Sequence, residues 1–124
     1  MPKYVFICSY SPGSWARLMR VSDDRVDATN RLMEYLGGSL HELYWEASGR
    51  AAYAIADMPD SATAAAAITV LTHTGAFKSV EADELLTQEQ LDNVLALADN
   101  AAEIYQVPGH LVLGNDSSSR RFQR

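Results

Sequence analysis

The chain has 124 residues, 48% of them hydrophobic, and a formal net charge of −6 at pH 7. This length fits one domain with its own core, and the negative charge argues against nucleic acid or an anionic membrane as partner. The single cysteine, Cys8, excludes an internal disulfide and favours a reducing compartment. No signal peptide or membrane-spanning run is recognisable, so we expect a cytoplasmic protein.

Residues 3–10 form a run of aromatic and β-branched side chains, which predicts a strand. Side chains alternate across a strand, so its two faces differ. The aliphatic face, with Val5 and Ile7, suits packing beneath helices. The other face suits a pocket or a partner sheet. It carries Tyr4, Phe6, Cys8 and Tyr10.

Residues 15–36 predict two helical segments. A short helical turn is expected over residues 15–20. Ser22 is the expected N-cap of a longer helix, because two acidic residues follow it and favour a helix N-terminus. Gly37-Gly38 ends this helix by adopting the left-handed conformation common at helix C-termini.

Residues 39–60 predict two antiparallel strands joined by a turn at residues 47–50. Strict alternation places His41, Leu43 and Trp45 on one face of the first strand, with Tyr44 on the other. Which of these two faces lines a pocket stays open. The second strand carries alanines on one face, which permit the close approach of a helix. These are Ala52, Ala54 and Ala56.

Asp60 is the expected N-cap of a second long helix over residues 61–74. A fourth strand follows over residues 76–84, and a capping box at residues 87–90 begins a third long helix. The polar stretch 111–124 is expected to be a disordered tail.

The element order is β-α-β-β-α-β with an added C-terminal helix, which predicts an α+β, ferredoxin-like domain over residues 1–110. Its four-stranded antiparallel sheet has helices on one face only, so the other face must be covered. A second copy of the chain would cover this face without requiring a different protein. The pattern therefore predicts a homodimer with its sheets face to face.

Five short segments within residues 3–90 carry a family resemblance. They are Tyr4-Val5, Leu36-Gly37-Gly38, Tyr44-Trp45, Met58-Pro59-Asp60, and Thr74-Gly75-Ala76-Phe77-Lys78-Ser79 leading into Leu85-Leu86-Thr87. With these segments the chain resembles the GYD-domain proteins. The resemblance implies a dimeric α+β barrel, and it implies no defined common activity.

The Gly-x-Tyr-Asp signature of that family falls at the hairpin turn and is not retained. Ser48 stands at the glycine position, Arg50 at the tyrosine and Ala51 at the aspartate. Matching Gly49 instead moves the aspartate position to Ala52. The signature carboxylate is missing either way, so its role is not carried over.

His41 and His73 are the candidate acid–base residues. His41 would act as a general base if its face lines a cavity, and the dipole of the second long helix would favour protonated His73. The alternative for His41 is a hydrogen-bonded or solvent-facing strand residue, and the alternative for His73 is a surface residue at the helix C-terminus. No cluster predicts a metal site, and no cofactor is expected. The candidate ligand-binding residues are Tyr4, Phe6, Tyr10, Trp15, Trp45, Tyr53, Phe77 and Glu81.

Three functions fit these patterns. The first is a protein that binds a small apolar or aromatic molecule. The second is a cofactor-independent isomerase, cyclase or monooxygenase acting on an aromatic or polyketide-like substrate, by analogy of fold. The third is a structural or interaction dimer. A cavity with a histidine on its wall would favour the enzyme, and a cavity filled by the protein's own aromatic residues would favour the structural dimer.

Overall fold

The computed structural model describes residues 1–20 and 24–109. They form two compact units, Met1–Leu86 and a second unit that begins at Thr87. No helix in the described part of the chain is long and apolar enough to cross a membrane. The elements are β1 (Lys3–Tyr10), α1 (Pro12–Arg20), α2 (Arg25–Tyr35), β2 (Ser39–Trp45), β3 (Ala51–Asp57), α3 (Ser61–His73), β4 (Phe77–Leu85) and α4 (Gln88–Ala101).

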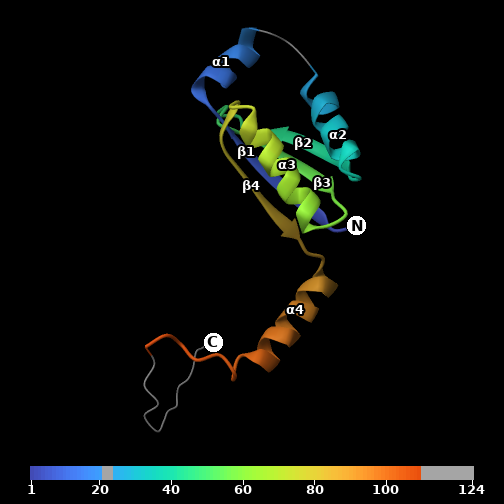
Figure 1. The fold of residues 1–124 in the computed structure, drawn as a ribbon, viewed down its shortest axis with the longest axis vertical. Helices are drawn as coiled ribbons and strands as arrows, with labels where there is room; N and C mark the ends of the chain where they lie inside the picture. Colours follow the sequence, from blue (N-terminus) through green and yellow to red (C-terminus); the bar gives the residue numbers. More distant parts are fainter. Residues whose placement is uncertain (21–23, 110–124) are drawn as a thin grey trace. The chain divides into compact units, whose positions relative to one another are not determined.

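All four strands belong to one antiparallel sheet in the order β2-β3-β1-β4. The first strand in sequence therefore lies in the middle, between β3 and β4, and the β2–β3 hairpin forms one side of the sheet (Figure 1). This arrangement confirms the expected α+β, ferredoxin-like fold.

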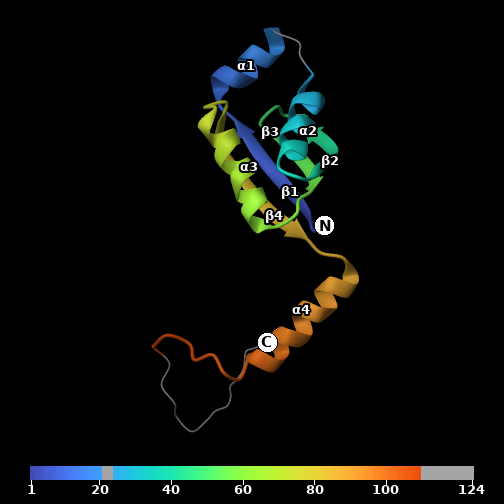
Figure 2. The same ribbon diagram turned by 45° about the vertical axis from the view of Figure 1, so that its right-hand side comes forward.

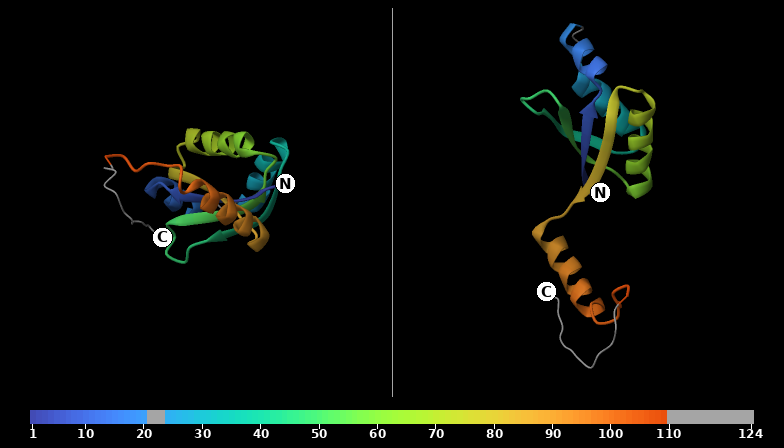
Figure 3. Two further views of the ribbon diagram at one scale, coloured as in Figure 1. Left: turned by 90° about the horizontal axis from the view of Figure 1, so that it is seen from below. Right: turned by 90° about the vertical axis from the view of Figure 1, so that its left-hand side faces the viewer.

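Helices α2 and α3 cover one face of the sheet, with α3 packed against β4 and α2 against β2 (Figures 1 and 2). Seen along the sheet, α3 lies on one side while the hairpin turn curves away from it (Figure 3). The core fills the space between the sheet and the two helices. Its largest fully buried side chains are Phe6, Met33 and Met58.

The aromatic face of β1 packs beneath the helices. Tyr4 and Phe6 are buried, whereas Val5 and Ile7 on the opposite face keep partial exposure. Phe6 stands beside Ala54 of β3, so its large ring fills space that a small neighbour leaves. The expectation that the aliphatic face lies under the helices is therefore wrong.

The face of the sheet opposite α2 and α3 is called the open face below. Its centre is apolar, because Val5 pairs with Ile55, and Ile7 pairs with Tyr53. Glu81 of β4 stands beside Ile7 on this face. The open face includes Lys3, Val5, Ile7, Ser9, Ser39, His41, Glu42, Tyr44, Ala51, Tyr53, Ile55, Asp57, Ser79, Glu81, Asp83 and Leu85.

A register shift in β2 moves His41 off the face that strict alternation predicts. β2 advances by two residues from Leu40 to Glu42 while β3 advances by one, so the strand bulges at His41. Leu40 and Leu43 both pack against the core, and His41 reaches Asp57 on the open face. The expectation that His41 shares a face with Leu43 is therefore wrong.

A second register shift lies at the start of β4. Ser9 pairs with Ser79 and Tyr10 with Phe77, which leaves Lys78 as an extra residue on β4. Phe77 therefore packs against the core, although strict alternation groups it with Ser79. The shift turns two aromatic rings, those of Tyr10 and Phe77, toward the same side of the sheet.

Two helices begin at positions that differ from the expected ones. α1 starts at Pro12, three residues early, because the hydroxyl oxygen of Ser11 accepts a hydrogen bond from an amide of the first turn (3.3 Å). Proline suits a helix start, where its missing N–H costs nothing. Asp24 caps α2 and accepts a hydrogen bond from the Asp27 N–H (2.9 Å). Ser22, the expected cap, lies outside the described residues.

Gly37 and Gly38 connect α2 to β2, each for its own reason. Gly37 has a φ of +90°, a conformation that other residues rarely adopt. A Cβ atom on Gly38 would collide with the carbonyl oxygen of Asp57. The glycine pair therefore both ends the helix and lets the chain pass close to the end of β3.

The expected caps of the last two helices are confirmed. Asp60 and Thr63 form a capping box at the start of α3, and Thr87 and Gln90 form one at the start of α4. The single-domain boundary at residue 110 stays a prediction, since Thr87 begins a separate compact unit. The expected tail, 111–124, lies outside the described residues.

Candidate functional site

A cavity of about 170 Å³ lies between the core side of the sheet and helices α2 and α3. We call it the apolar cavity, because most of its lining consists of hydrocarbon. Residues from β1, β2, β3, α2 and α3 form its walls, together with the segment that leads into β4. Central lining residues are Cys8, Leu32, Met33, Leu43, Ala54 and Phe77.

Alanines on β3 create the space for this cavity. Ala52 and Ala54 line it, and both are almost fully buried. Ala54 also belongs to a core cluster that includes Ala64 and Ala67 of α3. The small side chains let α3 approach the sheet closely and leave room beside Met33 that neighbouring side chains do not fill.

Tyr10 is the centre of an aromatic cluster at one end of the cavity. Its ring centroid lies 5.0 Å from that of Phe77 and 5.6 Å from that of Trp15. Its hydroxyl oxygen accepts a hydrogen bond from the Trp45 indole nitrogen at 3.2 Å. Trp15 and Trp45 do not line the cavity, so they act by fixing the position of Tyr10.

A second cavity, of about 150 Å³, adjoins the first and is called the arginine cavity. Arg17 of α1 and Arg25 of α2 line it, together with Ser14 and Leu18. The two cavities share part of their lining, which shows that they are neighbours. The shared residues are Tyr10, Arg25, Ala76 and Phe77.

Cys8 contributes a neutral thiol to the apolar cavity. Burial raises the pKa of this thiol to about 11, because a low-dielectric environment disfavours the thiolate. The side chain is 6% exposed. Cys8 is therefore a small apolar wall residue at physiological pH, and it is not an activated nucleophile.

The predicted ligand-binding residues separate into three groups. Tyr10 and Phe77 line the apolar cavity, with Trp15 and Trp45 behind Tyr10. Tyr4 and Phe6 are buried in the core cluster. The remaining two, Tyr53 and Glu81, lie on the open face. Tyr53 donates a hydrogen bond to Glu46 at 2.9 Å, which raises the pKa of the tyrosine hydroxyl.

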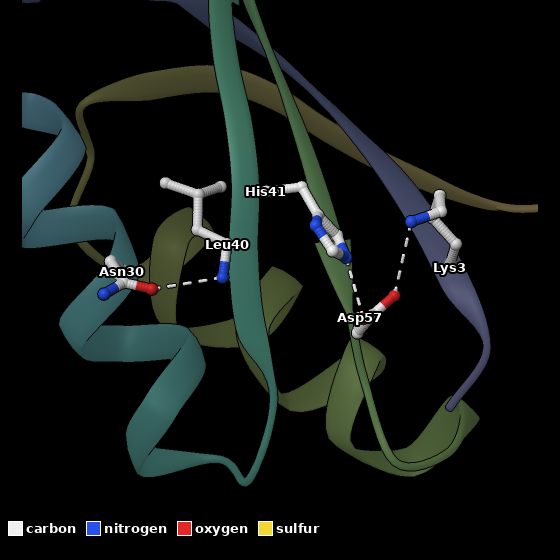
Figure 4. Close-up of polar contacts among 5 residues, drawn as sticks. All are labelled: Lys3, Asn30, Leu40, His41 and Asp57. Carbon is white, nitrogen blue, oxygen red and sulfur yellow. Dashed lines mark hydrogen bonds and ion pairs between the residues drawn. The ribbon is translucent and has the colours of Figure 1, made fainter.

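Neither predicted acid–base residue lines the apolar cavity. His73 is exposed at the last residue of α3. His41 Nε2 lies 2.7 Å from Asp57 Oδ2, and Lys3 Nζ lies 3.6 Å from the other oxygen of that carboxylate. The hydrogen bond from His41, with Lys3 beside it, lowers the pKa of Asp57. Figure 4 shows this chain of contacts across three strands.

The edge strand β2 is anchored beside this cluster. The side-chain oxygen of Asn30 in α2 accepts a hydrogen bond from the Leu40 amide at 3.1 Å (Figure 4). This hydrogen bond uses the Leu40 N–H, which faces away from β3. An unpaired N–H on that side of an edge strand is a site where the strand of another molecule can pair. His41, Asp57 and Lys3 therefore form a structural cluster on the open face, on the far side of the sheet from the cavity.

Arg25, Thr29 and Thr74 are the polar cavity residues that sequence patterns do not indicate. Arg25 stands at the first position of α2, where arginine is unremarkable. Among the described residues, no three potential ligands gather that could hold a metal ion.

The family model described as the GYD domain matches residues 4–95. A comparison with solved structures matches the crystal structure of PA3566 from Pseudomonas aeruginosa. It has 16% sequence identity and a TM-score of 0.46, over 69% of this chain and 93% of that chain. The search of curated proteins found no match. Because the family match spans well over half of the chain, the protein belongs to the GYD domain family.

Proposed function

We propose that the protein binds a small apolar or aromatic molecule in the apolar cavity. The observation that carries this proposal is an apolar cavity of about 170 Å³, partly open to solvent, between the sheet and helices α2 and α3. A buried cavity of roughly 150 Å³ lined by apolar side chains stays dry and accepts benzene, so this volume suits one ring. The polar groups of Thr29, Thr74 and Tyr10 supply a few orienting contacts.

The cavity favours binding over the two other candidate functions. An acid–base enzyme needs a proton-transfer group on the cavity wall, and both His41 and His73 lie elsewhere. A purely structural dimer needs no space in its core. Here the aromatic rings of Tyr10 and Phe77 border the cavity and leave it open.

A homodimer is the second part of the proposal. Val5, Ile7, Tyr53 and Ile55 form an apolar strip on the open face, and none of them is fully buried. A second copy would remove this strip from water, with its own sheet stacked against the first. The lone buried Cys8 supports a cytoplasmic location.

Native mass spectrometry of freshly purified protein tests the binding proposal. A retained small molecule is expected on the natural protein and is expected to be lost from Ala28→Leu, because the added side chain fills the apolar cavity. Ala65→Leu is the matched control, since Ala65 is exposed on α3. Equal retention by both variants would contradict binding in this cavity.

Light scattering tests the dimer. The natural protein is expected to have the mass of two chains, and Ile55→Lys is expected to give monomers by charging the centre of the open face. Val70→Lys is the control, because Val70 lies on the exposed side of α3 and is 46% exposed. A monomeric natural protein at micromolar concentration would contradict the face-to-face dimer.

A further inference from the structure

One face of helix α2 forms a wall of the apolar cavity. Its lining residues recur at positions i, i+3, i+4, i+7 and i+8, the spacing that places side chains on one side of a helix. They are Arg25, Ala28, Thr29, Leu32 and Met33. Thr29 stands in the middle of this row and is partly buried. It brings a hydroxyl group to a wall that consists mostly of hydrocarbon.

The Thr29 hydroxyl has no hydrogen-bond partner among residues 1–20 and 24–109. A threonine inside a helix commonly donates its hydroxyl proton to the carbonyl oxygen one turn earlier. Thr69 of α3 does so, with its Oγ1 at 2.9 Å from the Ala65 carbonyl oxygen. Because Thr29 forms no such bond with Arg25, its donor and its acceptor are both available to a molecule in the cavity.

The other hydroxyl and guanidinium groups on the cavity walls have partners within the protein. The Thr74 hydroxyl donates to the Leu71 carbonyl oxygen at 2.7 Å, and its oxygen accepts a hydrogen bond from a backbone amide at 3.2 Å. Tyr10 and Arg25 are likewise engaged in interactions of their own. Thr29 is therefore the wall residue with the most hydrogen-bonding capacity left for a ligand.

The chemistry of the ligand decides whether the Thr29 hydroxyl is paired in the complex. The cavity is partly open to solvent, so water can pair with this hydroxyl before a ligand binds. A hydrocarbon that displaces the water leaves the hydroxyl unpaired beside apolar surface, which weakens binding. A ligand with a hydroxyl group at the matching position restores the hydrogen bond.

We infer that the ligand of the apolar cavity is a neutral phenol, a single aromatic ring whose hydroxyl group pairs with that of Thr29. This inference rests on the proposed binding function and adds the chemical class of the ligand. The hydroxyl groups of a phenol and of threonine each donate and accept, so the two match. The ring suits the volume of about 170 Å³ and lies against hydrocarbon walls such as Met33 and Phe77.

The test measures dissociation constants by NMR titration for phenol and toluene, which have nearly the same shape and differ by a hydroxyl in place of a methyl group. The decisive quantity is the ratio of the toluene constant to the phenol constant. Comparing this ratio between variants cancels the different hydration of the two free ligands. Thr29→Val is expected to lower the ratio about fivefold or more, the effect of one hydrogen bond.

The two ligands are expected to respond differently to Thr29→Val. Phenol binding weakens, because its hydroxyl loses its partner. Toluene binding stays the same or tightens, because valine has nearly the shape of threonine and leaves no unpaired hydroxyl. A general disturbance of the cavity would weaken both ligands.

Two further variants serve as controls. Thr29→Ser keeps the hydroxyl and is expected to keep the ratio within about twofold of that of the natural protein. Thr69→Val makes the same change as Thr29→Val at an exposed residue of α3 that does not line the cavity, and it is expected to leave the ratio unchanged.

The outcomes separate the two proposals. A ratio that is unchanged in Thr29→Val, or a natural protein that binds toluene without phenol, would overturn the phenol inference and leave small-molecule binding standing. Binding of neither ligand to the natural protein would overturn both. Loss of both ligands from Thr29→Val, or an equally lowered ratio in Thr29→Ser, would also overturn the inference, because side-chain shape rather than the hydroxyl would then control binding.

Discussion

The Trp15 indole lies directly over Gly49, and a Cβ atom on that glycine would stand 2.5 Å from the indole Cζ2. This contact joins α1 to the turn of the β2–β3 hairpin. Trp15 also packs against Tyr10, which lines the apolar cavity. The geometry of the hairpin turn and that of the cavity wall therefore depend on the same tryptophan.

Gly49→Ala is expected to lower the free energy of unfolding for two reasons. Its φ of +80° costs a residue with a Cβ about 1–2 kcal/mol, and the new methyl group pushes against Trp15. Gly75→Ala is the matched control, since Gly75 has a φ of +75° and open space around it. Urea denaturation of both variants should show a larger loss for Gly49→Ala. Equal losses would mean that the Trp15 contact contributes nothing.

Asp57→Asn is expected to make the free energy of unfolding depend less on pH in acidic solution. The pKa of Asp57 is lowered in the folded protein by the hydrogen bond from His41 and by Lys3, so folding favours the carboxylate. That contribution is complete above the unfolded value of 3.8 and is lost as the pH falls through the lower folded pKa. Thermal denaturation at a series of pH values checks this.

The difference in stability between the natural protein and Asp57→Asn should be largest above the unfolded pKa and should shrink in more acidic solution. Lys3→Gln provides a graded comparison, because it keeps the His41 hydrogen bond and removes only the more distant cation. A difference that grows on acidification would contradict the assigned direction of the shift.

Two bulges explain why the sequence predicts the order of helices and strands correctly but assigns some strand side chains to the wrong face of the sheet. The element order, the hairpin and the caps at Asp60 and Thr87 follow from local patterns, and each is present. Strict alternation fails at His41 and Lys78, because an extra residue turns the side chains that follow. Such a residue is fixed by pairing with another strand, which no local pattern records.

The site was harder to predict than the fold, for a related reason. Tyr10 and Phe77 were candidate ligand-binding residues, and both line the apolar cavity. The cavity itself arises because Ala52 and Ala54 leave space that the helices do not fill. An alanine predicts close packing and an empty volume equally well, so only the assembled sheet and helices distinguish the two. The position of Arg25 beside this space depends likewise on tertiary packing.

Cys8 is expected to react slowly with iodoacetamide at neutral pH, because the thiolate is the reactive form and burial raises the thiol pKa to about 11. The rate, followed by mass spectrometry, should rise about tenfold for each pH unit below that value. The same protein in denaturant is the control and should react fast. Rapid alkylation of the folded protein at neutral pH would contradict a buried Cys8.

Iodobenzene soaked into crystals of the protein shows directly whether a small aromatic molecule binds in the apolar cavity, because iodine is located by its anomalous scattering. An iodine site is expected inside the apolar cavity, close to Cys8, Met33 and Phe77. Iodine found only on the outside of the molecule, with the cavity empty or closed by the surrounding side chains, would contradict the claim that this protein binds small apolar molecules in its core.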